Sequence, residues 1–230
     1  IYVISRISGE GKDRRKVKGD YYLSEREEED LRYLAEMNKP VILILNAGGP
    51  VELTDILEQT DNIKGILNIS QLGQEGGDAL ADVLLGKEVP GGKLTTTWAR
   101  RYEDYPASEE YGYLNGNLEK EKYKEGIYVG YRYFDSFDKK VMFPFGFGLS
   151  YTMFEMKCCS INMEESKIRA EVQVTNTGNE YAGKEVVQIY VTLPQTELEK
   201  EYKRLAGFAK TRLLKPGETQ TLTVEIPQKQ

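Results

Sequence analysis

One carboxylate in the sequence stands between two glycines, in a loop that otherwise carries mostly positive charge. Glu10 lies at the centre of RISGEGKDRR (residues 6–15), which directly follows the apolar run IYVIS. Flanking glycines allow positive φ angles and close approach of another surface. A carboxyl group presented in this way is a candidate general acid, provided that its surroundings keep it protonated near neutral pH. An exposed loop with an incidental glutamate is the commoner origin of so short a pattern, so SGEG alone assigns no function.

The composition restricts the other chemistry that this chain could perform. Histidine is absent from the 230 residues, which excludes Ser-His-Asp and Cys-His nucleophilic machinery within the chain, and two cysteines are too few for a usual zinc site. A net charge of -6 gives no general attraction to nucleic acid or to anionic lipid. We therefore expect no metal, no cofactor and no nucleic acid partner. We also expect no membrane span, because no apolar run approaches about 18 residues.

The elements that must position Glu10 follow from the pattern of residues 1–86. Apolar runs alternate with helical segments in the order IYVIS, SEREEEDLRYLAE, VILILN, VELTDILE, GILNIS and QEGGDALADVLLG. This β-α alternation predicts a parallel sheet. Ser24 with Glu27 predicts a capping box at the first helix start, and Gly86 predicts a left-handed cap at the last helix end. VILILN lacks alternation, as expected of a strand buried on both faces.

The topology of such a sheet predicts where a site would form. Ligands of open α/β sheets lie beyond the carboxyl ends of the strands. Glu10, Asn46 and residues 71–75 each follow one of the three apolar runs, so we expect them to share one edge. The run GQEGGDALADVLLG matches neither of the usual phosphate-binding fingerprints, and its acidic residues would repel a phosphate, which disfavours a nucleotide site.

The pattern changes after residue 86. Residues 87–150 are irregular and rich in tyrosine, which predicts a long connection that packs through its aromatic rings. From about residue 154 the period is two, and the runs KIRAEVQVTN, KEVVQIYV and TLTVEIP are separated by turn signals without a helix. This pattern predicts a small antiparallel sandwich. The adjacent Cys158 and Cys159 are expected to point to opposite faces of a strand and to pack as small apolar side chains.

Together these segments resemble the family 3 glycoside hydrolases of the β-glucosidase type. The matching stretches cover nearly the whole chain in order: ISGEGKDRR with GDYYL, GQEGGDALADVLLGK with PGGKL, EGIYVGYRYFD, PFGFGLSYTMF, and VTNTGNEYAGKEVVQIYV with LAGFAKTRLLKPGE. The resemblance implies a partial three-layer α/β sandwich with a mainly parallel sheet over residues 1–150, and a fibronectin III-like β-sandwich over residues 151–230. Because the chain begins with Ile inside an expected strand, we expect a fragment of a longer protein in which a (β/α)8 barrel is a further domain.

The resemblance also implies an activity and a role for the SGEG loop. The expected enzyme is a retaining, exo-acting β-glucosidase that removes terminal non-reducing β-D-glucosyl residues from small β-linked oligosaccharides or glucosides. Glu10 corresponds to the general acid/base, and the nucleophilic aspartate belongs to the barrel, so the fragment alone should be inactive. The loop residues expected to support Glu10 are Ser8, Gly9, Gly11, Asp13 and Arg14. Asp13 and Arg14 are expected to brace the loop through a local ion pair, whereas the cations Arg6, Lys12, Arg14 and Arg15 would lower the pKa of Glu10.

Other interpretations remain open from the sequence. A non-catalytic carbohydrate-binding or scaffolding module, with the tyrosine-rich connection stacking on sugars, is the main alternative, and a nucleotide-binding domain is a third. Association into homo-oligomers is also open. The lack of a disulfide pattern favours the cytoplasm, with the periplasm or secretion as alternatives.

Overall fold

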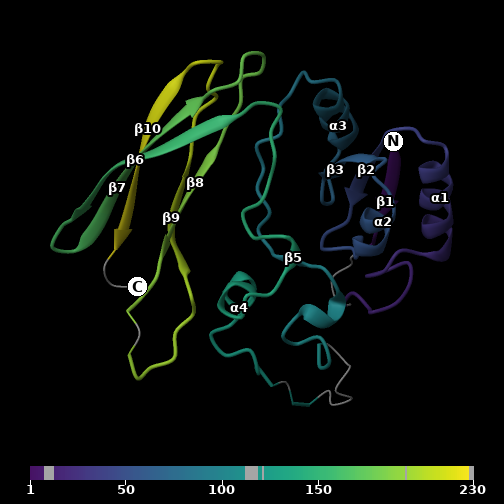
Figure 1. Cartoon of the computed structure of the whole chain (residues 1–230), viewed down its shortest axis with the longest axis horizontal. Coiled ribbons are helices and arrows are strands. Elements are labelled where there is room, and N and C mark those ends of the chain that lie inside the picture. Colours follow the sequence, from purple (N-terminus) through teal and green to yellow (C-terminus); the bar gives the residue numbers. More distant parts are fainter. Residues whose placement is uncertain (8–12, 112–118, 121, 195, 228–230) are drawn as a thin grey trace. The chain divides into compact units, whose positions relative to one another are not determined.

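The computed structural model describes residues 1–7, 13–111, 119–120, 122–194 and 196–227, which form two compact units (Figure 1). The first unit contains residues 1–80, 98–125 and 140–143, and the second contains residues 81–97, 126–139 and 144–230. Parts of the tyrosine-rich connection therefore belong to each unit. The predicted domain boundary at residue 150 stays a prediction.

A parallel sheet forms the centre of the first unit. Its strands are β1 (Tyr2–Ser5), β2 (Val41–Asn46) and β3 (Ile63–Asn68), in the order β1-β2-β3. Strand β2 is central, and its residues Leu43, Ile44 and Leu45 are almost fully buried, which confirms the prediction for VILILN. Side chains on both faces of β2 are covered, so this strand fixes the sheet on which the loops at its carboxyl edge are built.

Helices connect the parallel strands. Helix α1 (Glu25–Glu36) begins with the predicted capping box, in which the Ser24 hydroxyl accepts from the Glu27 amide and the Glu27 carboxylate accepts from the Ser24 amide. Helix α2 (Thr54–Gln59) contacts α1, as expected when two right-handed crossovers place both helices on one face of the sheet. Helix α3 (Gly76–Leu84) follows β3 and ends before Gly86, whose φ of 72° confirms the predicted left-handed cap.

The tyrosine-rich connection contains short elements and packs through its rings. These elements are the strands β4 (Trp98–Ala99) and β5 (Val141–Phe143), the 3-10 helix η1 (Tyr102–Asp104) and helix α4 (Tyr131–Ser136). In the first unit Tyr102 packs edge-on against Tyr21, with ring centroids 5.0 Å apart. In the second unit Tyr131 stacks near Phe145, with centroids 4.9 Å apart. The prediction that this segment packs through aromatic rings is confirmed for these residues.

Antiparallel strands form the second unit. One sheet has the order β10-β7-β6, with β6 (Phe154–Met163), β7 (Lys167–Asn176) and β10 (Thr219–Pro227), and the other pairs β8 (Val186–Val191) with β9 (Arg204–Lys210). Apolar side chains from both sheets meet in one core that contains Val172, Val174, Val187 and Leu222. The predicted antiparallel sandwich is therefore confirmed.

Asn176 is a buried polar junction at the end of β7. Its amide nitrogen donates to the carbonyls of Tyr181 and Leu214 at 2.9 Å each, and its amide oxygen accepts from the Thr152 hydroxyl at 2.6 Å and the Gly178 amide at 3.1 Å. The side chain is fully buried, so these four bonds tie the turn after β7 to two other segments.

One prediction about the second unit is wrong. Cys158 and Cys159 are free, as expected, but both are exposed rather than packed in a core. The reason is that β6 is an edge strand of its sheet, paired on one side only, and carries a register shift between Cys158 and Ser160. Among the described residues, no helix is long and apolar enough to cross a membrane.

Candidate functional site

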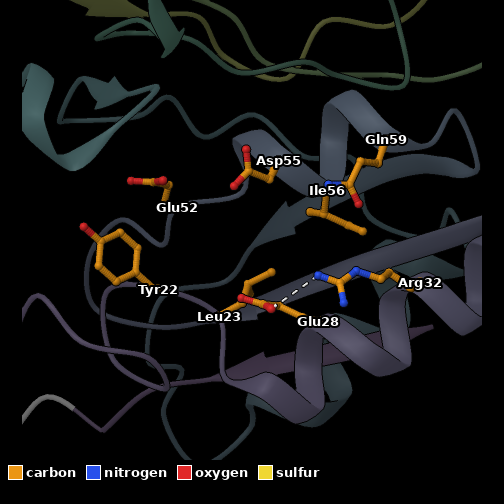
Figure 2. Close-up of a pocket in the computed structure, with 8 residues that line it drawn as sticks. All are labelled: Tyr22, Leu23, Glu28, Arg32, Glu52, Asp55, Ile56 and Gln59. Carbon is orange, nitrogen blue, oxygen red and sulfur yellow. Dashed lines mark hydrogen bonds and ion pairs between the residues drawn. The ribbon is translucent and has the colours of Figure 1, made fainter.

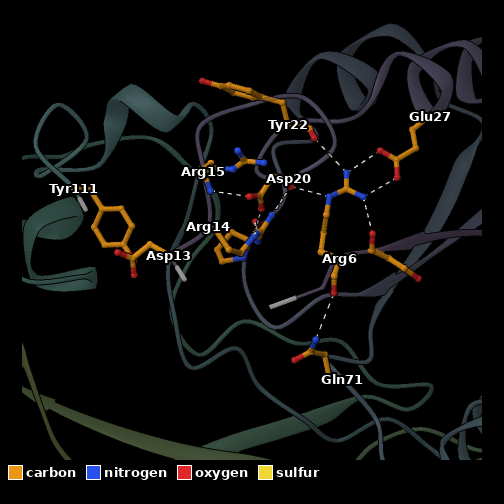
Figure 3. Close-up of polar contacts among 11 residues, drawn as sticks. Arg6, Asp13, Arg14, Arg15, Asp20, Tyr22, Glu27, Gln71 and Tyr111 are labelled. Atoms are coloured by element: carbon orange, nitrogen blue, oxygen red, sulfur yellow. Dashed lines mark hydrogen bonds and ion pairs between the residues drawn. The ribbon is translucent and has the colours of Figure 1, made fainter. Parts of the chain in front are cut away.

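The carboxyl edge of the parallel sheet brings the three predicted loops together at Arg6. The Arg6 amide donates to the Asn46 carbonyl at 3.0 Å, which extends the pairing of β1 with β2 by one residue. On its other side, the Gln71 side chain donates to the Arg6 carbonyl at 3.4 Å (Figure 3). The prediction that these loops share one edge is confirmed for Asn46 and Gln71, while Glu10 lies outside the described residues.

Arg6 forms a buried, bidentate ion pair with Glu27. Its Nη1 and Nη2 atoms each lie 2.7 Å from a different Glu27 carboxylate oxygen, and the two side chains are only 4% and 15% exposed. Burial alone would raise the pKa of Glu27, but the hydrogen bonds from Arg6 and from the Ser24 amide outweigh it and hold that pKa below its usual value. The same carboxylate therefore caps helix α1 and fixes the chain that leaves β1.

Arg14 ties the far end of the SGEG segment to the same region. Its Nε donates to the Asp20 carboxylate at 2.9 Å, and its Nη1 donates to the Pro50 carbonyl at 2.5 Å. Pro50 belongs to the loop that follows β2, so Arg14 links two of the three edge loops. The guanidinium also lies over the Tyr21 ring, 6.0 Å from its centroid.

The expected ion pair between Asp13 and Arg14 differs from the observed arrangement. Arg14 forms its ion pair with Asp20, and the Asp13 carboxylate instead accepts from the Tyr111 hydroxyl at 3.4 Å (Figure 3). A folded-back segment between residues 15 and 22 brings Asp20 to Arg14, because the Tyr21 amide donates to the Arg15 carbonyl at 3.3 Å. No local pattern in residues 15–22 predicts this turn, and the prediction of Asp13 as the partner rests on its proximity along the sequence.

The remaining predicted loop residues lie outside the described part of the chain. These are Ser8, Gly9, Glu10, Gly11 and Lys12. Their assigned roles stay predictions. What the structure does describe is both flanks of the segment, where Arg6 and Arg14 are each neutralised by a carboxylate. Of the four cations expected to lower the pKa of Glu10, the ion pairs neutralise Arg6 and Arg14, while the Arg15 side chain is exposed and Lys12 lies outside the described residues.

Tyrosine rings and an ion-pair network pack next to the segment that contains Asp20. Tyr21 is buried against Tyr102 and Tyr105. Burial is the main cause that raises the pKa of the Tyr21 hydroxyl, and the nearby Tyr105 hydroxyl is the second. The Glu52 carboxylate accepts from the Tyr102 amide at 2.8 Å and from Arg101 at 3.2 Å. Residues 98–105 of the tyrosine-rich connection are thus packed within the first unit.

A shallow pocket opens between α1 and α2 (Figure 2). Its charged groups are already engaged in ion pairs: Glu28 with Arg32, and both Glu52 and Asp55 with Arg101. The pocket therefore presents no free charged group for acid-base work. Its lining residues are Tyr22, Leu23, Glu28, Arg32, Glu52, Asp55, Ile56 and Gln59.

Sequence reasoning missed three of the residues that build this edge. Asp20, Glu27 and Tyr111 received no role at the site, although GDYYL was noted as part of the resemblance and Glu27 was predicted as a cap. Their partners lie 6, 21 and 98 positions away along the chain. No periodicity reports such pairings, and an excess of arginine around a glycine-rich loop is the one signal that points to nearby carboxylate partners.

The fold and the site together define a two-unit protein, with a parallel α/β unit that carries loops at its carboxyl edge and an antiparallel β-sandwich. The family described as Glycosyl hydrolase family 3 C-terminal domain matches residues 1–131, and the Fibronectin type III-like domain matches residues 185–230. The chain belongs to glycosyl hydrolase family 3, which confirms the resemblance seen in the sequence.

Relatives and solved structures match along almost the whole chain. Beta-glucosidase A of Butyrivibrio fibrisolvens is 40% identical and matches 98% of this chain and 31% of that protein. The structure of β-glucosidase 3B from Thermotoga neapolitana in complex with glucose has a TM-score of 0.90 and 45% identity, over 98% of this chain and 32% of that one. An exo-α-(1→6)-L-arabinopyranosidase of Bifidobacterium breve is 34% identical over 86% of this chain and 25% of its own length. The chain thus spans about a third or less of the length of these proteins.

Proposed function

We propose that this chain is part of a retaining β-glucosidase that hydrolyses terminal non-reducing β-D-glucosyl residues, and that it supplies the general acid/base, Glu10. The observation that carries the proposal is the match of the whole chain to relatives named β-glucosidase, with Arg6, which precedes SGEG in the sequence, lying at the carboxyl edge of the sheet. Ligands of open α/β sheets bind at this edge, so a catalytic carboxylate is expected there.

The chemistry requires a second carboxylate that this chain is not expected to supply. In a retaining glycosidase, two carboxyl groups about 5–5.5 Å apart flank the scissile bond, one as nucleophile and one as acid. Glu10 would protonate the departing glycosidic oxygen while an aspartate of the (β/α)8 barrel attacks the anomeric carbon. Glu10 would then take a proton from the water that hydrolyses the glycosyl-enzyme. The chain alone is therefore expected to be inactive.

The electrostatics of the described flanks support an acid at this position. A general acid must keep its proton near neutral pH, and unpaired cations nearby would oppose this. Arg6 and Arg14 stand on either side of the SGEG segment in the sequence and are neutralised by Glu27 and Asp20, whereas the Arg15 side chain is exposed to solvent. Docking of a further domain and of substrate would then exclude water from Glu10, which raises its pKa without having to overcome two free guanidinium groups.

The non-catalytic alternative depends on tyrosine rings that are free to stack on sugars. Tyr102 and Tyr105 pack against Tyr21, and Tyr131 packs against Phe145 and Tyr190, so these rings are engaged within their own units. These three rings are therefore not available to stack on a sugar, whereas Tyr123 of the same connection is 87% exposed.

Aryl β-glucosides with good and poor leaving groups test this proposal in the full-length enzyme that contains this chain. With Glu10→Gln, kcat/KM for a poor phenol leaving group should fall by several orders of magnitude, since general acid catalysis contributes about 10²–10⁴-fold. A dinitrophenol departs without protonation, so kcat/KM for the dinitrophenyl glucoside should stay within a few-fold of wild type. Unchanged kcat/KM for both substrates would remove Glu10 from the mechanism.

A further inference from the structure

We propose that Asp20 is a positioning residue for the general acid, because with Arg6 and Arg14 it closes the stem of the loop that carries Glu10. This inference rests on the proposed function of Glu10. In the sequence, Arg6 precedes the SGEG stretch and Arg14 follows it, while Asp20 lies in the returning segment GDYYL. The three residues come together in the first unit (Figure 3).

Both arginines donate to a single backbone oxygen. The Asp20 carbonyl accepts from the Arg6 Nε at 2.7 Å and also from the Arg14 Nη2. Two residues on opposite sides of the SGEG stretch are thereby held at the same point. Neither bond depends on a long solvent-exposed side chain, because Arg6 is buried and the side chain of Arg14 is only 17% exposed.

The Asp20 carboxylate adds a second pair of bonds to the later flank. One oxygen accepts from the Arg14 Nε at 2.9 Å and the other accepts from the Arg15 amide at 2.7 Å. Burial alone would raise the pKa of Asp20, but these bonds outweigh it and lower that pKa, so the group is ionised near neutral pH. A carboxylate that binds a side chain and the next backbone amide fixes both the position and the direction of the chain there.

The clamp formed by Arg6, Arg14 and Asp20 is itself attached to rigid elements. Arg6 is bound to Glu27 of helix α1, and its amide continues the pairing with strand β2. Arg14 is bound to the Pro50 carbonyl after β2. A catalytic group held by such a supporting shell needs less ordering in the transition state, and a displacement of about 1 Å can cost about 10²-fold in rate.

A merely structural role for Asp20 predicts a different result from a positioning role. If Asp20 only stabilises the fold, its loss lowers the amount of folded enzyme and reduces turnover of every substrate by the same factor. If Asp20 positions the proton donor, its loss reduces turnover of substrates in proportion to their need for a proton. The ratio of kcat/KM values for poor and good leaving groups separates the two roles, because it is independent of the concentration of active enzyme.

The experiment uses the full-length enzyme with Asp20→Asn and the matched control Asp55→Asn. Asp55 is also a carboxylate paired with an arginine in the first unit, but it lies in α2 and its partner is Arg101, which is not part of the clamp. We expect Asp20→Asn to reduce kcat/KM for the poor leaving group by about 10–100-fold and to change that for the dinitrophenyl glucoside by less than about 3-fold. Asp55→Asn should leave the ratio of the two unchanged. An unchanged ratio in Asp20→Asn would overturn the proposal.

Two further variants keep the test decisive. Arg14→Lys retains the charge but replaces the separate donors Nε, Nη1 and Nη2 by one nitrogen, so the planar fork that bridges Asp20 and Pro50 is lost. It should shift the ratio in the same direction even if Asp20→Asn fails to fold. Glu10→Gln is measured in parallel. A shifted ratio in Glu10→Gln with no shift in Asp20→Asn or Arg14→Lys would refute the positioning role alone. No shift in Glu10→Gln would refute the proposed function.

Discussion

Replacing Glu27 by glutamine tests whether the buried ion pair with Arg6 holds the first unit together. The Glu27 carboxylate accepts three hydrogen bonds, two from Arg6 at 2.7 Å and one from the Ser24 amide at 2.8 Å. Glutamine offers one acceptor oxygen and turns an NH₂ group towards a donor. At least one donor is then left unsatisfied, and the Arg6 guanidinium loses its counter-charge in a site where it is only 4% exposed.

The size of the effect follows from these losses. Breaking a buried ion pair by removing one partner costs about 3–5 kcal/mol, and an unsatisfied buried donor alone costs about 1–3 kcal/mol. Because glutamine keeps part of the bonding, we expect Glu27→Gln to lower the free energy of unfolding by about 3 kcal/mol. The neighbouring Glu28 is the matched control, since its pairs with Lys18 and Arg32 are exposed and should contribute less than about 1 kcal/mol.

Urea denaturation followed by tryptophan fluorescence measures both variants. The chain has one tryptophan, Trp98, which is buried in the first unit and therefore reports on that unit alone. The folded state lowers the pKa of Glu27, so its stabilisation is complete above the usual pKa of a glutamate and is lost as the pH falls through the lowered value. The gap between wild type and Glu27→Gln should thus begin to narrow as the pH falls below about 4. Equal small losses for Glu27→Gln and Glu28→Gln at pH 7 would refute the reasoning.

Two further predictions concern stability elsewhere. Asn176→Ala should destabilise the second unit by about 3 kcal/mol, because it removes four hydrogen bonds and leaves the Tyr181 carbonyl and the Thr152 hydroxyl without this partner, while the Leu214 carbonyl keeps its bond from the Gly183 amide. Thermal unfolding compared with the exposed Asn162→Ala checks this, and equal melting temperatures would contradict it. Gly76→Ala should destabilise α3, because the added Cβ would lie 2.4 Å from the Cβ of Leu72. At Gly77 an added Cβ meets nothing within 4 Å, so Gly77→Ala should stabilise the helix by about 0.5–1 kcal/mol. Denaturation midpoints that move in the same direction for the two variants would contradict this prediction.

The sequence predicted the elements of this fold well because each has a local signal. The unbroken apolar run of β2, the Ser24–Glu27 capping box and the left-handed Gly86 all depend on residues within a few positions of one another. The antiparallel strands carry the same kind of signal in their period of two. The exposure of Cys158 could not be predicted, because it depends on which strand lies at the edge of the sheet. The residues of one strand do not determine which strands pair with it.

The candidate site was predictable in position but not in its supporting contacts. Parallel strands present the loops at their carboxyl ends at one edge of the sheet, and this rule alone predicts that Asn46 and Gln71 lie near the chain that leaves β1, where both contact Arg6. The partners of Arg6 and Arg14 depend instead on the path of residues 15–24, which is irregular. Sequence reasoning assigned Arg14 to the adjacent Asp13, whereas the fold delivers Asp20. Charges near a loop therefore indicate that ion pairs will form, but the folded-back segment of residues 15–22 determines which carboxylate pairs with Arg14.

Azide rescue of the Glu10→Gln variant of the full-length enzyme tests the central claim most directly. Without a base, the glycosyl-enzyme formed from dinitrophenyl β-glucoside reacts slowly with water, but azide needs no deprotonation and attacks the same intermediate. The account predicts that added azide restores turnover in Glu10→Gln and yields β-glucosyl azide with retained configuration, while wild-type turnover is unaffected. Hydrolysis by Glu10→Gln that azide neither accelerates nor diverts to the glucosyl azide would contradict the assignment of Glu10 as the general acid/base.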